Sequence, residues 1–81
     1  MPIRNPKQLG AALRRERKRQ GLTQVELAEK AGLRQQTISA VEGGKLRSQL
    51  YVVFEILTAL ELDFHMASRA AKPPPDFPDL F

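Results

Sequence analysis

The chain has 81 residues, of which 42% are hydrophobic and 27% are charged, and it contains no cysteine. A chain of this length forms one small, marginally stable domain. Because no disulfide can stabilise it, we expect oligomerisation to bury further surface. No apolar stretch approaches the roughly 20 residues that span a bilayer, and no secretory segment follows Met1. We therefore expect a soluble, cytoplasmic protein without a membrane partner.

Basic residues are concentrated in the first half of the chain. Residues 1–47 hold eleven Lys and Arg against four Glu, a net charge of +7, whereas residues 48–81 hold two basic against five acidic residues, a net charge of −3. A basic half favours nucleic-acid binding, but a solvated basic helix has the same composition. Charge alone leaves both interpretations open.

The first predicted helix covers about residues 6–20. Asn5-Pro6 is a typical N-cap and first-turn pair, and Gly21 ends the helix. The exposed surface carries the basic run of residues 14–19. The inward face is formed by Leu9, Ala12 and Leu13.

Two short helices follow, over about residues 24–31 and 34–42. Thr23 and Glu26 have the spacing of a capping box, and Gly32 ends the first of the two helices. The second has an apolar side and a polar side, the polar side formed by Arg34, Gln35, Gln36 and Ser39. Two helices joined by a tight turn, the second with an exposed polar side, indicate a helix-turn-helix whose second helix enters the DNA major groove.

Gly43-Gly44 closes the third helix, and Ser48 is a candidate cap for a fourth over residues 49–60. The predicted inward stripe of this helix, at spacings of three and four residues, is Leu50, Val53, Phe54, Leu57 and Leu60.

After Leu60 the hydrophobic period changes from helical to two. Leu62, Phe64 and Met66 alternate with other residues, which predicts a strand over residues 61–68, although the segment could instead extend the fourth helix. A lone strand needs a partner for its backbone groups. We expect it to pair with the same strand of a second subunit, which places Leu62, Phe64 and Met66 in a homodimer interface.

Residues 71–81 are rich in proline and are predicted to be an extended tail after a domain over residues 1–70. Phe77, Leu80 and Phe81 are either a short docking motif or part of an inert terminus.

The run LTQVELAEKAGLRQQTISAVEGGK resembles the helix-turn-helix of the phage-repressor-like XRE/Cro family, and the likeness covers about residues 7–60. The order of elements, with a fourth helix running into LELDFHM, is similar to that of HipB-type antitoxins, the autorepressor partners of HipA-type kinases. The resemblance implies a mostly α, phage-repressor-like fold of four to five helices, with one C-terminal strand paired across a homodimer.

Roles for individual residues agree with this resemblance. Arginine can contact guanine and glutamine can contact adenine through paired hydrogen bonds, so Arg34, Gln35, Gln36 and Ser39 are predicted to contact bases. Phosphate contacts are predicted for Gln24 at a helix N-terminus, for Thr37, and for Lys45 and Arg47 in the following loop. Arg17 and Glu42 match family positions that form a partly buried ion pair, which assigns them to the scaffold.

Glu16 departs from the family pattern, because that position is usually apolar. Either the first helix is rotated slightly, or the glutamate is exposed or paired with a nearby arginine.

An enzyme is not expected, because the chain has one histidine, no cysteine, no paired carboxylates and no complete phosphate-binding loop. No metal or cofactor is predicted. The expected partner is double-stranded DNA with an inverted-repeat operator, its half-sites about one helical turn (roughly 34–36 Å) or a multiple apart. We predict an antitoxin that autoregulates its operon and binds a HipA-like kinase toxin. The alternatives are a stand-alone repressor or controller protein, and an interaction module with vestigial DNA affinity.

Overall fold

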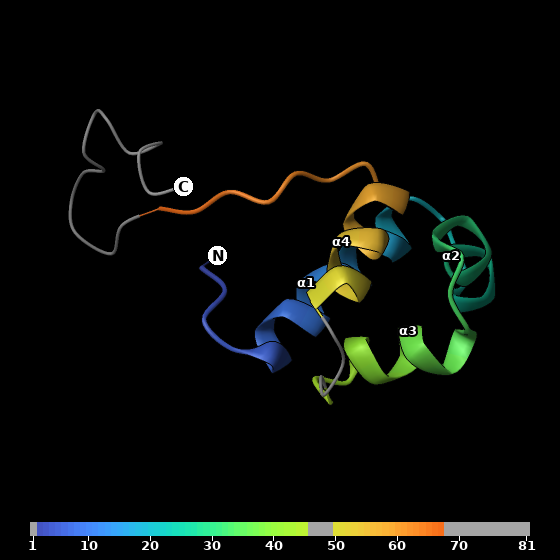
Figure 1. Cartoon of the computed structure of the whole chain (residues 1–81), viewed down its shortest axis with the longest axis horizontal. Helices are drawn as coiled ribbons and strands as arrows, with labels where there is room; N and C mark the ends of the chain where they lie inside the picture. Colours follow the sequence, from blue (N-terminus) through green and yellow to red (C-terminus); the bar gives the residue numbers. More distant parts are fainter. Residues whose placement is uncertain (1, 46–49, 68–81) are drawn as a thin grey trace.

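The computed structural model describes residues 2–45 and 50–67. Within these ranges the chain forms four α-helices: α1 (Pro6–Arg19), α2 (Gln24–Ala31), α3 (Gln35–Glu42) and α4 (Leu50–Ala59) (Figure 1). The mostly helical fold class is confirmed, and none of these helices is long and apolar enough to cross a membrane. The predicted cap at Ser48 and the tail over residues 71–81 lie outside the described residues.

Local signals in the sequence account for the start of α1 and for both ends of α2. The Asn5 side chain accepts a hydrogen bond from the backbone N–H of Gln8 (2.8 Å), and Pro6 occupies the first turn of α1. The capping box at α2 is complete: Glu26 N–H donates to Thr23 Oγ1 (3.0 Å), and Thr23 N–H donates to Glu26 Oε1 (2.8 Å). This second bond lowers the pKa of Glu26. At the end of α2, Gly32 adopts φ 70°, the left-handed conformation that glycine accepts without strain.

A single apolar core joins the four helices. Its largest fully buried side chains come from α2, α3 and α4 and from the residue after α4, and they are Leu27, Ile38, Val41, Ile56 and Leu60. Leu13 contributes from α1, and Leu9, Leu22, Leu33 and Leu62 pack partly buried around the cluster. The core therefore holds the α2–α3 unit against α1 and α4.

The predicted inward stripe of α4 was partly wrong. Val53 and Leu57 are buried as expected, but Leu50 and Phe54 are exposed, and Val52 and Ile56 are buried instead. The error arises because α4 is apolar on two faces, so residue spacing alone does not identify the face that packs on the core.

Close backbone contact fixes α1 against the end of α3. A Cβ atom on Gly10 would lie 2.2 Å from the Val41 carbonyl oxygen and 2.6 Å from that of Glu42, far inside van der Waals contact. A Cβ on Gly44, after α3, would lie 2.8 Å from Cα of Lys7. Glycine at these two positions lets the helices approach closely, a requirement that the sequence analysis missed.

The chain leaves the helical body after α4. Helix α4 ends at Ala59, so the alternative that residues 61–68 extend this helix is wrong. Residues 62–67 lead away from the body without helix (Figure 1), and no strand is present in residues 2–45 or 50–67 of the single chain. Because a strand's hydrogen bonds come from a neighbouring strand, pairing across a dimer stays a prediction.

Candidate nucleic-acid interface

Helix α3 carries most of the predicted base-contacting residues on its solvent side. Gln35, Gln36 and Ser39 are exposed, while Ile38 and Val41 anchor the opposite side in the core. Arg34 is also exposed but lies one residue before the helix, as its N-cap, with an extended backbone and no side-chain capping bond. The start of α3 therefore presents four polar side chains to solvent, an arrangement that suits contact with base edges in a groove.

A buried ion pair supports this helix from behind. The Arg17 guanidinium donates two hydrogen bonds to the Glu42 carboxylate, Nε to Oε2 at 2.6 Å and Nη2 to Oε1 at 3.0 Å. The two side chains are only 8% and 4% exposed, and a third bond joins Arg17 Nη1 to the Leu22 carbonyl oxygen (2.8 Å). The bond to Glu42 raises the pKa of Arg17. Arg17 thereby connects three parts of the chain, namely α1, Leu22 in the turn between α1 and α2, and the end of α3.

Two glutamines connect the ion pair to the surface through hydrogen bonds. Gln24 Nε2 donates to Glu42 Oε1 (3.1 Å), and Gln35 Nε2 donates to Gln24 Oε1 (2.7 Å). Gln35 retains a free Nε2 hydrogen and its Oε1 acceptor, so it can still form two hydrogen bonds with adenine. The relay from Arg17 through Glu42 and Gln24 to Gln35 therefore orients one of the predicted base-contacting side chains.

The predicted phosphate contacts differ in how accessible they are. Lys45 is exposed directly after α3, and Thr37 is half-buried within the helix. The side chain of Gln24 is also half-buried and bridges Glu42 and Gln35, which leaves one Nε2 hydrogen and the backbone N–H at the start of α2 for a phosphate. Arg47 lies outside the described residues.

Glu16 pairs with a nearby arginine, as one of the expectations for this position stated. Its carboxylate accepts hydrogen bonds from Arg19, which lower the pKa of Glu16, and it also accepts one from Gln20 Nε2 (3.4 Å). Gln20 Nε2 also donates to the Leu60 carbonyl oxygen (2.8 Å). The bond from Gln20 to Leu60 connects the end of α1 to the residue that follows α4, and nothing in the sequence pattern indicated it.

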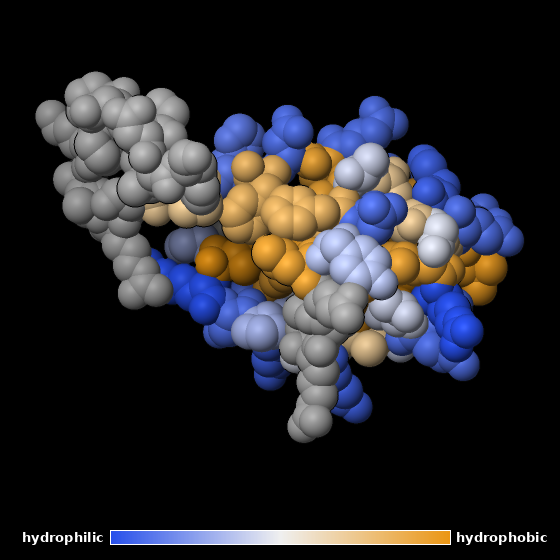
Figure 2. Space-filling model, in the orientation of Figure 1, coloured by the Kyte–Doolittle hydropathy of each residue, from blue (hydrophilic) through white to orange (hydrophobic). Residues whose placement is uncertain are grey.

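The face opposite the core on α4 is apolar and exposed. Leu50 and Tyr51 are 67% and 59% exposed, and Phe54 is also exposed. The ring of Phe64 packs on that of Phe54, with the centroids 5.9 Å apart, and remains 55% exposed itself. Figure 2 shows apolar side chains gathered across the middle of this face of the molecule. We call the set Leu50, Tyr51, Phe54, Phe64 and Met66 the outer apolar patch.

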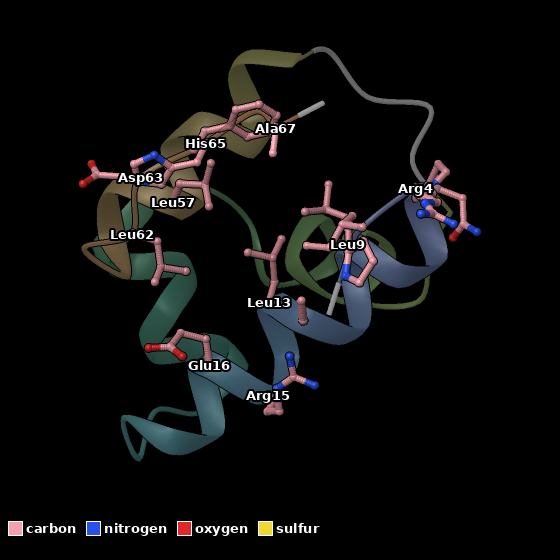
Figure 3. Close-up of a pocket in the computed structure, with 16 residues that line it drawn as sticks. Arg4, Leu9, Leu13, Arg15, Glu16, Leu57, Leu62, Asp63, His65 and Ala67 are labelled. Atoms are coloured by element: carbon pink, nitrogen blue, oxygen red, sulfur yellow. The ribbon is translucent and has the colours of Figure 1, made fainter. Parts of the chain in front are cut away.

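A groove of about 680 Å³ lies beside this patch, between the N-terminal segment, α1 and residues 62–67. Figure 3 shows leucines from α1, α4 and the 62–67 segment around it, with charged side chains that include Arg15 and Glu16. Leu62, predicted for the dimer interface together with Phe64 and Met66, packs partly buried against the chain's own core. The three side chains therefore differ in exposure.

Comparison with known proteins places the chain in a family. A model of the helix-turn-helix family matches residues 13–65. Antitoxin HipB from Escherichia coli strains CFT073 and K12 is 43% identical over 60 residues, which cover 74% of this chain and 64% and 68% of those two proteins. The chain thus spans about two thirds of the length of these relatives.

Solved structures give the same result. A chain of the HipA–HipB–O2–O3 complex superposes with a TM-score of 0.79 and 38% identity, covering 85% of this chain and 97% of that one. The restriction-modification controller protein C.AhdI from Aeromonas hydrophila gives a TM-score of 0.64 and 33% identity, covering 68% and 83% of the two chains. This protein therefore belongs to the XRE-type helix-turn-helix family, with HipB antitoxins among its relatives.

Proposed function

We propose that this protein is a dimeric, sequence-specific DNA-binding repressor and the antitoxin of a HipA-type kinase. The observation that carries the DNA-binding part is the exposed polar side of α3, whose Gln35 is oriented by the Arg17–Glu42–Gln24 relay. An oriented amide on the first turn of a helix, beside the exposed guanidinium of the N-cap residue Arg34, suits the donor and acceptor pattern of the major groove. The HipB relatives, which occur in complexes with the O4 20mer and with HipA, O2 and O3, support the same function.

Base contact by Gln36 is tested by comparing a selected operator with random DNA. Gln36→Ala is expected to weaken operator binding by about 1–3 kcal/mol, because one bidentate base contact is lost, with little change on random duplex. Fluorescence anisotropy at fixed salt measures both affinities. Gln8→Ala, on α1, is the control variant and should leave the ratio unchanged. An equal loss on the two DNAs would contradict a base-contacting role.

The dimer in this proposal forms through the outer apolar patch. A helix that is apolar on two faces is normally covered on both, and α4 uses one face for its own core. Phe64 and Met66 extend the uncovered face into the 62–67 segment, whose backbone can pair with the same segment of a second chain. A two-fold dimer of this kind places two α3 helices on one side of DNA, as an inverted repeat requires.

Tyr51→Asp is expected to shift the protein from dimer to monomer, because it places a charge in an apolar interface while changing no core contact. Sedimentation equilibrium at micromolar concentration measures the change. Val25→Asp, which introduces the same charge at a similarly exposed apolar residue of α2 outside the patch, is the control and should leave the dimer intact. A Tyr51→Asp protein that sediments as the wild-type dimer would contradict the interface.

The second candidate is a stand-alone controller protein, which the similarity to C.AhdI favours. Purification of the tagged chain from its native host separates the two functions. An antitoxin retains a kinase of the HipA type at a fixed ratio, whereas a stand-alone regulator binds its operator and retains no kinase.

A further inference from the structure

Three basic side chains form a stripe along α1. Lys7, Arg14 and Lys18 are exposed and follow one another at spacings of seven and four residues, so they lie on one face of the helix, with the small Ala11 between them. Within residues 2–45 and 50–67, Arg17 and Arg19 form ion pairs with glutamates. The side chains of Lys7, Arg14 and Lys18 form no hydrogen bond or ion pair within these ranges. We call Lys7, Arg14 and Lys18 the α1 stripe.

The α1 stripe begins beside the loop that follows α3. Because a Cβ on Gly44 would lie 2.8 Å from Cα of Lys7 and 3.1 Å from its Cβ, Lys7 is a direct neighbour of the turn that carries Lys45. Lys45 is exposed and is one of the predicted phosphate contacts. The positive charge at the end of α3 is therefore continuous with the positive charge on α1.

The helical geometry also places the α1 stripe at the edge that faces α3. Gly10 and Arg17 mark that edge, because Gly10 contacts the Val41 and Glu42 carbonyls and Arg17 binds Glu42. Lys7 precedes Gly10 by three positions. Arg14 follows Gly10 by four positions and precedes Arg17 by three, so both basic residues adjoin the same edge. Leu9 and Leu13, by contrast, turn towards the core and the groove.

We propose that the α1 stripe binds phosphates of the DNA backbone outside the major-groove contact made by α3. The proposal rests on the DNA-binding function proposed above and extends it. Lys18 lies eleven positions after Lys7, a rise of about 16 Å at 1.5 Å per residue, and a DNA strand carries one phosphate per 3.4 Å of axis. Three cations at this spacing can follow several phosphates of one strand. Such contacts increase affinity without selecting a sequence.

The salt dependence of DNA binding tests this proposal. The full-length chain is titrated into a 30-base-pair random duplex and into a duplex recovered by in vitro selection, at several NaCl concentrations. Each neutralised phosphate contributes about 0.9 to the slope of log K against log salt. Lys7→Gln, Arg14→Gln and Lys18→Gln combined are therefore expected to reduce the slope by about 2.7 for each bound subunit, with the preference for the selected duplex over random DNA unchanged.

A charge-matched variant separates local contact from net charge. Arg4→Gln, Arg19→Gln and Lys30→Gln combined remove the same three charges from exposed positions outside the face of the stripe, and this variant should keep a slope close to that of the wild type. Equal slopes for the two triple variants would overturn the proposal. It would also be overturned if the stripe variant kept the wild-type slope but captured less of a protein partner. If the wild-type chain prefers no selected duplex, the proposed function itself fails, which is a distinct result.

Discussion

Gly10→Ala is expected to destabilise the domain by about 2 kcal/mol or more, although alanine is normally the better helix former by about 1 kcal/mol. The new Cβ would lie 2.2 Å from the Val41 carbonyl oxygen, and a backbone atom cannot rotate out of the way. Helices α1 and α3 must therefore separate. At about 4–8 °C per kcal/mol, the melting temperature should fall by roughly 10 °C or more.

Ala11→Gly supplies the matched control for this prediction. Ala11 is the next residue of α1 and is exposed, so the variant measures the local helix propensity alone. Urea unfolding of both variants and of the wild type gives the comparison. A Gly10→Ala protein as stable as the wild type, or more stable, would show that the close contact between α1 and α3 does not form.

Glu42→Ala is expected to cost about 3–5 kcal/mol of unfolding free energy, because it leaves the Arg17 guanidinium buried without its carboxylate. Gln24 loses its hydrogen-bond acceptor in the same variant, so the orientation of Gln35 is also lost. We therefore expect weaker operator binding even at temperatures where the variant is folded. Thermal denaturation and anisotropy on the same samples measure the two effects.

The other Arg–Glu pair among the described residues is the natural comparison for this effect. Glu16→Ala breaks the surface pair with Arg19, whose two side chains are 21% and 67% exposed, and should leave the unfolding free energy close to that of the wild type, because water reaches both groups. Arg17→Met combined with Glu42→Leu removes both buried charges and should recover part of the stability lost in Glu42→Ala. A Glu42→Ala protein no less stable than Glu16→Ala would contradict the proposed role of the buried pair.

Local signals explain why much of the fold was predictable. The Asn5 cap, the capping box of Thr23 and Glu26, and Gly32 each act within a few residues, and they define the ends of α1 and α2 in the structure. Contacts between residues that are distant in the sequence were harder to predict. Gln24 lies 18 residues from Glu42 and 11 from Gln35, and no periodicity reports which of their donors and acceptors meet.

Helix α4, which is apolar on two faces, shows a second reason why residue spacing does not predict every buried side chain. Both of its faces satisfy an apolar helical pattern, so Phe54 and Val53 are equivalent by spacing although one is exposed and the other is buried. Gly10 shows the opposite case, in which a residue was overlooked because glycine inside a helix normally only weakens it. Its role depends on the Val41 and Glu42 carbonyls at the end of α3, which are more than thirty positions away.

The positioning of α3 has a consequence for how DNA preference can change. The main-chain contact at Gly10 and the Arg17–Glu42 pair hold the helix, while Gln36 and Ser39 are exposed and take part in neither. Gln35 is exposed like Gln36 and Ser39, but its bond to Gln24 also connects it to the Arg17–Glu42 pair that holds the helix. With the base contacts that we propose for Gln36 and Ser39, randomising these two residues should select new operators with no loss of fold, so that a single stable scaffold supplies regulators that do not cross-react.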